Sequence, residues 1–303
     1  APARPKPAPA PTLVRGWHNI GVHGENFSAS FSKVFGQMQS YRFGTTRSGG
    51  RELLRSSPTP NFWHAPTANE RAWGAPATDG SWLLASRYIH WEKAFGNPTC
   101  EERERSVAVT YTYTLPTTPE SSCTVEYDVH GDGEIVVTVR VSPGEGLPDM
   151  PEFGMLFEAD ADLQHLRWYG EGPEECYVDR RLGARLDVYE RNVNDLLTPY
   201  NRPQEAGSRT GVRWAEVRDE RGTGLRFAHE GEMEFSALPW TPFEIENARH
   251  HSELPASHRT VLRPALMRRG VGGDNTWGAQ THPEYRLPRG EELEFRFSFR
   301  GVM

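Results

Sequence analysis

Residues 123–141 read CTVEYDVHGDGEIVVTVRV, and this stretch decides the fold class. Two runs of mostly β-branched and aromatic residues, 123–129 and 134–141, flank the segment HGDG at 130–133. Residues of these types favour β-strands, and a short Gly- and Asp-containing segment between two strands is typical of a hairpin turn. The stretch therefore predicts two antiparallel strands joined by a tight turn.

The same alternation continues on both sides of this hairpin. In 292–299 (ELEFRFSF), apolar and polar residues alternate with the period of two that a half-buried strand requires. Helical signals are few: 241–248 begins with Thr, Pro and a Glu three residues after the Thr, which predicts one short helix. Many strands and so little helix predict an all-β fold, a large antiparallel sandwich. Further predicted strands are 27–31, 38–43, 107–114, 213–218 and 224–228.

The composition excludes several classes of protein. The 303 residues carry a formal charge of −7, so nucleic-acid binding has no basic footprint. No run approaches the ~18–20 apolar residues of a membrane helix. The three cysteines lie far apart, which excludes a disulfide framework and a CxxC metal site. No segment resembles a signal peptide, so the sequence predicts a cytoplasmic protein.

Residues 1–14 differ in composition from the rest of the chain. The first twelve, APARPKPAPAPT, include five prolines and have no apolar periodicity. Such a segment favours an extended polyproline conformation and cannot bury a core. We predict a Pro/Ala-rich linker at 1–14, with more chain preceding it, and one domain at 15–303.

The segment Gly270–Trp277 (GVGGDNTW) is the strongest candidate for a ligand site. Adjacent glycines allow the backbone to turn sharply, Asp274 and Asn275 offer short hydrogen-bonding side chains, and Trp277 offers a flat apolar face. Sugars have polar edges and apolar faces, so this combination suits a sugar. The alternative is a tight turn in which Asp and Asn bond the backbone and Trp277 packs in the core.

Two other segments hold groups capable of acid–base chemistry. Glu171, Glu174 and Glu175 could act as paired carboxylates. We favour a polar loop in which Arg180 or Arg181 pairs with a glutamate or with Asp179 and fixes the shape of the loop.

In the segment 60–70 we expect a rigid loop, with His64 a satisfied structural residue rather than a ligand or base. Neither the adjacent pair His250-His251 nor His258 has the spacing of a zinc site, so no metal site is predicted.

Five segments, in this order, carry a family resemblance: PNFWHAPT (60–67), WYGEGPEECYVDRRLGARLDVY (168–189), PYNRPQEAGSRTGVRW (199–214), FSALPWTPFEIENARHHSELP (235–255) and GVGGDNTWGAQTHPEYRL (270–287). Together they resemble the last domain of glycoside hydrolase family 2 β-galactosidases. The same domain occurs as the separate small subunit of two-chain β-galactosidases. The resemblance covers residues 17–300.

The resemblance implies a large antiparallel β-supersandwich similar to galactose mutarotase, packed beside a TIM-barrel domain or large subunit that supplies the catalytic glutamates. The tryptophan of the family's GGDDSW loop, which contacts the sugar, matches Trp277 here. The implied substrate-binding residues are Trp277, Asp274 and Asn275, and no catalytic residue lies on this chain. Any Mg²⁺ or Na⁺ is expected in the partner, and none in this chain.

The motifs depart from the family pattern at several positions. The second Asp and the Ser of GGDDSW are Asn275 and Thr276 here, which keeps the capacity for hydrogen bonding. PQENG reads PQEAG at 203–207, and one acid is missing from 68–70. These losses put the polar roles of those two loops in doubt but leave the fold assignment unchanged.

Two alternatives stay open beside an accessory domain of a β-galactosidase that hydrolyses terminal β-galactosides. An independent mutarotase-like aldose epimerase would need a general acid and base, for which His165, His282 and Glu284 are candidates by residue type alone. A non-catalytic carbohydrate-binding or structural module would use its aromatic residues to bind glycans or to fill the core.

Overall fold

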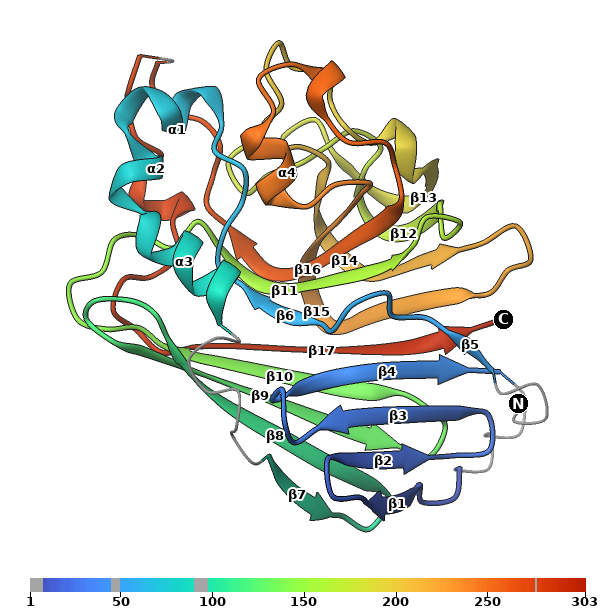
Figure 1. The fold of residues 1–303 in the computed structure, drawn as a ribbon. Coiled ribbons are helices and arrows are strands. Elements are labelled where there is room, and N and C mark those ends of the chain that lie inside the picture. Colours follow the sequence, from blue (N-terminus) through green and yellow to red (C-terminus); the bar gives the residue numbers. More distant parts are fainter. Residues whose placement is uncertain (1–7, 45–49, 90–97, 276) are drawn as a thin grey trace.

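The computed structural model describes residues 8–44, 50–89, 98–275 and 277–303. Within these ranges the strands form two antiparallel sheets of five and twelve strands (Figure 1). The five-stranded sheet runs in the order β1-β2-β3-β4-β5. Its strands are β1 (Thr12–Arg15), β2 (Asn19–His23), β3 (Phe27–Ser32), β4 (Gln37–Phe43) and β5 (Arg51–Glu52).

The larger sheet runs in the order β13-β12-β14-β15-β17-β10-β9-β8-β7, and β16, β11 and β6 branch from β15. Its bounds are β6 (Thr59–Asn61), β7 (Thr99–Glu102), β8 (Ser106–Leu115), β9 (Ser121–His130), β10 (Ile135–Ser142), β11 (Glu152–Asp160), β12 (His165–Gly172), β13 (Arg185–Asn192), β14 (Ser208–Arg218), β15 (Gly224–Leu238), β16 (Arg259–Arg268) and β17 (Leu293–Val302). The predicted all-β class, a large antiparallel sandwich, is confirmed.

The hairpin predicted at 123–141 is present as β9 and β10. Val129 lies opposite Ile135 and Cys123 opposite Val141, so the apolar residues of both strands share one buried face. Gly133 closes the turn with φ +90°, a conformation that only glycine adopts without strain. The predicted strands around 219–223 form a second hairpin, β14 and β15.

Aromatic side chains join the two sheets. Along β17 buried and more exposed residues alternate as predicted, and Phe299 packs edge-on against Phe157 with ring centroids 5.2 Å apart. Tyr41 of β4 meets Phe299 at 5.4 Å. The Tyr41 hydroxyl donates to Gly133 O at 2.6 Å and accepts from Gly301 N at 3.0 Å. One buried phenol therefore connects the five-stranded sheet to two elements of the larger one.

The expectation of a single short helix is wrong. The predicted helix is present as α4 (Pro242–Asn247), with the capping box of Thr241 and Glu244. Three further helices, α1 (Ala68–Trp73), α2 (Ala75–Thr78) and α3 (Gly80–Tyr88), cover one end of the sheets (Figure 1). Thr67 and Glu70 form a second capping box at α1. In the segment 60–70 the expected loop is present only at 62–67, a buried stretch between the end of β6 and the start of α1.

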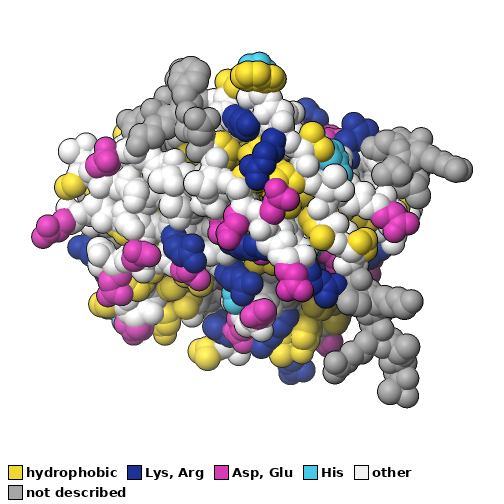
Figure 2. Space-filling view, turned by 90° about the horizontal axis from the view of Figure 1, so that it is seen from below, with side chains coloured by type: hydrophobic (Ala, Val, Ile, Leu, Met, Phe, Trp, Pro, Cys, Tyr) yellow, Lys and Arg dark blue, Asp and Glu magenta, His cyan; other side chains and the backbone are white. Residues whose placement is uncertain are grey.

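Two sequence expectations concern the ends and surface of the chain. Strand β1 begins at Thr12, inside the range 1–14 predicted as a linker, and residues 1–7 lie outside the described part of the chain. On the face seen in Figure 2, basic side chains lie beside acidic ones rather than in a patch of one sign. No helix within the described ranges is long and apolar enough to span a membrane.

Removing the hydroxyl that joins the sheets tests this arrangement. Tyr41→Phe should lower the free energy of unfolding by about 1–3 kcal/mol, because it leaves a buried N–H and a buried carbonyl without their partner. Urea unfolding of the purified chain measures the loss. Tyr189→Phe, which removes an exposed hydroxyl bond to Arg185 O, is the control. Equal stability of both variants would contradict the role given to Tyr41.

Candidate functional site

Trp277 lies at the tip of the loop that follows β16. Its side chain is 91% exposed, so the alternative of a core tryptophan is wrong. Asn275 Oδ1 accepts hydrogen bonds from the backbone N–H groups of Trp277 at 2.8 Å and Ala279 at 3.3 Å. Asn275 therefore has the turn-forming role that the alternative gave it, while Trp277 presents its ring to solvent. Thr276 lies outside the described residues.

Asp274 and His282 pair across the two limbs of this loop. His282 Nε2 lies 2.8 Å from Asp274 Oδ1, and both side chains are exposed. The hydrogen bond to Asp274 and the charge of its carboxylate raise the pKa of His282 above its ordinary value. Asp274 thus has a hydrogen-bond partner on the loop itself.

Helix α1 lies against the same loop. Asn69 Nδ2 donates to Ala279 O at 3.0 Å, and a Cβ on Gly278 would lie 3.7 Å from the Cβ of Trp73. The Arg269 guanidinium, one residue before the loop, lies over the Trp73 ring at 5.1 Å. The helix missed by the sequence analysis is therefore part of the support of the candidate site.

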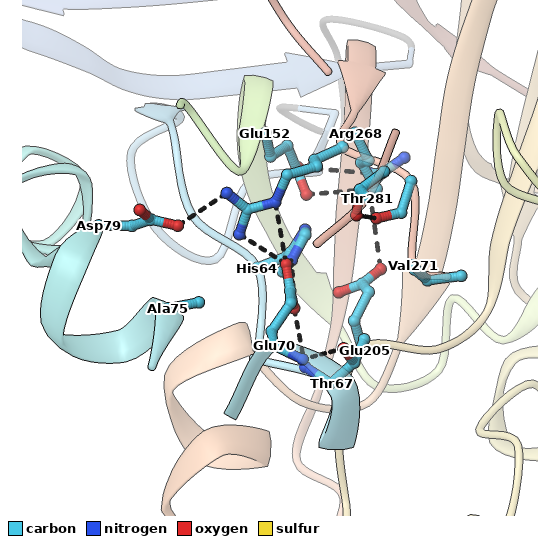
Figure 3. A network of polar contacts seen from close by, with 12 residues as sticks. His64, Thr67, Glu70, Ala75, Asp79, Glu152, Glu205, Arg268, Val271 and Thr281 are labelled. Carbon is cyan, nitrogen blue, oxygen red and sulfur yellow. Dashed lines mark hydrogen bonds and ion pairs between the residues drawn. The ribbon is translucent and has the colours of Figure 1, made fainter. Parts of the chain in front are cut away.

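A buried polar network connects α1 to the strands (Figure 3). His64 Nε2 lies 2.9 Å from Glu70 Oε1, and the charge of Glu70 outweighs the effect of burial, so the pKa of His64 is raised. Arg269 Nη2 donates to Glu70 at 2.6 Å, and its Nη1 donates to Asp79 at 2.7 Å. His64 is therefore buried and paired as a structural residue, but the prediction that it is satisfied holds only for Nε2, because Nδ1 has no hydrogen-bond partner among the described residues.

A second group of buried charges lies next to the first. Arg268 Nε donates to Glu152 Oε2 at 2.9 Å, and Arg263 Nη2 donates to both oxygens of Glu205 at 2.8 Å. Arg263 Nη1 also reaches Glu152 at 2.8 Å. Glu234 completes the group, with one oxygen 3.2 Å from Arg268 Nη1. Burial raises the pKa of Glu234 to about 7, the direction that lessens the surplus of carboxylates over arginines.

Two of the three glutamates of the 168–181 segment pair with arginines and hold the loop's shape, as favoured above. Arg180 Nη2 donates to the buried Glu175 at 2.9 Å, and Arg181 Nη2 donates to Glu171 at 2.5 Å. Glu174 is exposed, and its backbone oxygen accepts from the Cys176 thiol. Neither Glu171 nor Glu175 has the free carboxylate that glycoside cleavage requires.

The structure brings together only two of the three residues considered for an epimerase, His282 and Glu284. His165 Nε2 lies 3.0 Å from Glu220 at the β14–β15 turn, whereas His282 pairs with Asp274 and lies 3.7 Å from Glu284. Among the described residues, His165 forms its ion pair with Glu220 and none with Glu284. In the same ranges, no three His, Cys, Asp or Glu residues gather as ligands for a metal ion.

A model of the β-galactosidase small chain matches residues 23–300. The chain belongs to this family. The β-galactosidase of Halalkalibacterium halodurans is 39% identical over 294 residues, which are 96% of this chain and 28% of that protein. The β-galactosidase small subunit of Latilactobacillus sakei is 34% identical over 313 residues, covering 94% of this chain and 96% of the relative.

The first relatives are much longer than this small-chain domain. The chain spans 28% of the H. halodurans protein and 26% of the β-galactosidase of Priestia megaterium, to which it is 38% identical. Among solved structures, a putative aldose 1-epimerase from Escherichia coli has a TM-score of 0.47 at 12% identity, covering 97% of this chain and 99% of that one.

The buried network is what sequence reasoning missed in the small-chain domain. Arg263 lies within a run of apolar residues, TVLRPALM at 260–267, and a basic residue in such a run was a signal that it is buried and paired. Its partners lie 58 and 111 residues away along the chain. No local pattern could have identified them.

The raised pKa of Glu234 predicts a pH-dependent stability. Between its ordinary value of 4.5 and about 7 the folded chain holds a proton that the unfolded chain has released. The stabilising contribution of the protonated Glu234 to the free energy of unfolding is therefore present in full below pH 4.5 and is lost as pH rises through 7. Glu234→Gln should gain on the parent by up to about 2–3 kcal/mol between pH 5 and 8.

Urea unfolding at pH 5 and pH 8 measures this change. Glu294→Gln, which removes an exposed carboxylate from β17, controls for the loss of one negative charge. Parallel pH profiles of the parent and Glu234→Gln would contradict the buried proton.

Proposed function

We propose that this chain completes the galactoside-binding site of a β-galactosidase whose catalytic groups lie outside it. The observation that carries the proposal is the position of Trp277, held at the tip of an anchored loop with 91% of its side chain exposed. A large aromatic ring exposed on an ordered loop loses the favourable free energy of burial within the chain. This loss is recovered when another surface or a ligand covers the ring. A galactoside can stack its apolar face on the ring while its hydroxyl groups meet polar partners.

The catalytic carboxylates of this proposal come from the remaining part of the enzyme. Retaining cleavage requires two carboxyl groups about 5–5.5 Å apart, one of them free to attack the sugar. Glu175 is instead buried and accepts hydrogen bonds from Arg180 and Gly207 N. The chain spans only about a quarter of its longer relatives, which leaves ample sequence for a catalytic domain.

We further propose the finer assignments that the sequence resemblance implies. The enzyme is a glycoside hydrolase of family 2, its catalytic part is a TIM-barrel domain or a separate large subunit, and the assembled enzyme is an oligomer. Any Mg²⁺ or Na⁺ belongs to that partner, and the cytoplasmic location stays a prediction. Asp274 and Asn275 are proposed as neighbours of the bound sugar, with Trp277 making the principal contact.

Substitution of Trp277 tests the proposal in the assembled enzyme. Trp277→Ala should raise the KM for lactose or nitrophenyl galactoside about two- to tenfold, the equivalent of a stacking contact of ~0.5–1.5 kcal/mol. The kcat should change little, because stacking binds the substrate and the transition state alike.

The control is Trp17→Ala, since Trp17 is 95% exposed at the turn between β1 and β2 and belongs to the other sheet. An unchanged KM for Trp277→Ala would remove the site from this loop. Calorimetry of the isolated chain with galactose separates the proposal from an independent carbohydrate-binding module, which would bind the sugar without a partner. A polarimetric assay of anomerisation does the same for an epimerase.

A further inference from the structure

We propose that Asp179 is a positioning residue, which holds the base of the 270–282 loop and thereby sets the direction of Trp277. The inference rests on the proposed function of Trp277. Asp179 Oδ1 accepts a hydrogen bond from Val271 N at 3.1 Å, and its Oδ2 accepts one from Gly272 N at 2.7 Å. One carboxylate thus binds two successive N–H groups of a segment more than 90 residues away. Hydrogen bonds to an ionised acceptor are about twice as strong as neutral ones.

The glycines of the loop permit this close approach. A Cβ on Gly270 would lie 2.6 Å from Asp179 Cγ, and one on Gly272 would lie 3.1 Å from Asp179 Oδ2. A Cβ on Gly273 would meet Ala279 O at 2.5 Å, so the two limbs of the loop also lie close to each other. Glycines therefore suit the Gly-Val-Gly-Gly segment because neighbouring atoms leave little room for side chains at these three positions. Asp179 is the group that packs against the first part of the loop, Gly270–Gly272.

Asp179 is itself held in a rigid turn. Tyr177 N donates to Arg180 O at 3.3 Å, and Arg180 N donates to Tyr177 O at 2.8 Å, which closes a four-residue turn with Asp179 at its third position. The Tyr177 side chain is buried, and Arg180 is bound to the buried carboxylate of Glu175 at 2.9 Å. The segment 168–181, whose glutamates were considered for acid–base chemistry, thus fixes the orientation of the Asp179 carboxylate.

The same limb is held from its other side by Thr281. The Thr281 hydroxyl lies 2.7 Å from Gly270 O and 3.2 Å from Gly272 O, so Asp179 binds the N–H groups and Thr281 the carbonyls of one short segment. With 91% of its side chain exposed, Trp277 has little packing of its own to fix it. Its direction therefore depends on the loop that carries it, and Asp179 acts on the sugar only through that loop.

A double-mutant cycle in the assembled β-galactosidase tests the proposal. Asp179→Ala should raise the KM for a nitrophenyl galactoside by about the same two- to tenfold as Trp277→Ala, with little change in kcat. The double variant should have the KM of Trp277→Ala alone, because removal of the ring leaves Asp179 nothing to position. Asp179→Asn keeps one acceptor oxygen and should fall between the parent and Asp179→Ala. It also serves if the alanine variant fails to fold.

The matched control is Asp187→Asn, since Asp187 likewise accepts a backbone N–H, that of Val188, but lies on the exposed edge strand β13. Its KM should equal that of the parent. Effects of Asp179→Ala and Trp277→Ala that multiply in the double variant, or an Asp179→Ala enzyme with the KM of the parent, would overturn the proposal.

A spectroscopic measurement separates this inference from the proposed function. The chain is labelled with 5-fluorotryptophan, and the ¹⁹F resonance of Trp277 is assigned with Trp277→Phe. In Asp179→Ala this resonance should narrow and move toward its position in the urea-unfolded chain, while those of the other eight tryptophans stay in place. An unmoved resonance would refute the positioning role. An unchanged KM in Trp277→Ala, with the resonance shifted in Asp179→Ala, would refute only the sugar contact.

Discussion

Burial of three arginines among five carboxylates is the constraint on which the rest of this end of the molecule depends. Arg263, Arg268 and Arg269 are each at most 2% exposed, and a guanidinium out of water is tolerable only when its donors are met. Their partners come from three elements and two loop positions: Glu70 of α1, Glu152 of β11, Glu234 of β15, Asp79 before α3, and Glu205. Those elements must therefore take the relative positions in which the donors and acceptors meet.

The network determines the site because it ends where the loop begins. Arg269, which holds Glu70 of α1 and Asp79, is followed directly by Gly270. The 270–282 loop thus begins directly after a residue whose side chain is held by ion pairs. Asp179 binds the backbone of the second and third residues of the loop. In the proposed function the chain offers a sugar one exposed ring, and the placement of that ring depends on charges buried beneath the loop.

Much of the fold follows from local patterns, and the site does so only in part. The hairpin at 123–141, the alternation in β17 and the capping box of α4 are all set by residues close together in the sequence. Helices α1 to α3 were missed although Thr67 and Glu70 form a capping box, because helices of four to nine residues show little apolar periodicity. The exposure of Trp277 could not be predicted from the sequence, because tryptophan as a residue type fits both a core and an exposed binding surface. The partners of Arg263 and Asp179 lie far along the chain, and residue types alone do not identify them.

The separation between Asp179 and the loop it holds has a consequence for the order of folding. Closing a contact across more than 90 residues costs the chain conformational entropy. Such a contact therefore forms only when much of the surrounding structure already exists. A chain with its hairpins paired but its long-range contacts unmade therefore has no oriented Trp277. Under the proposed function, such a partly folded chain would lack the oriented ring that completes the sugar site.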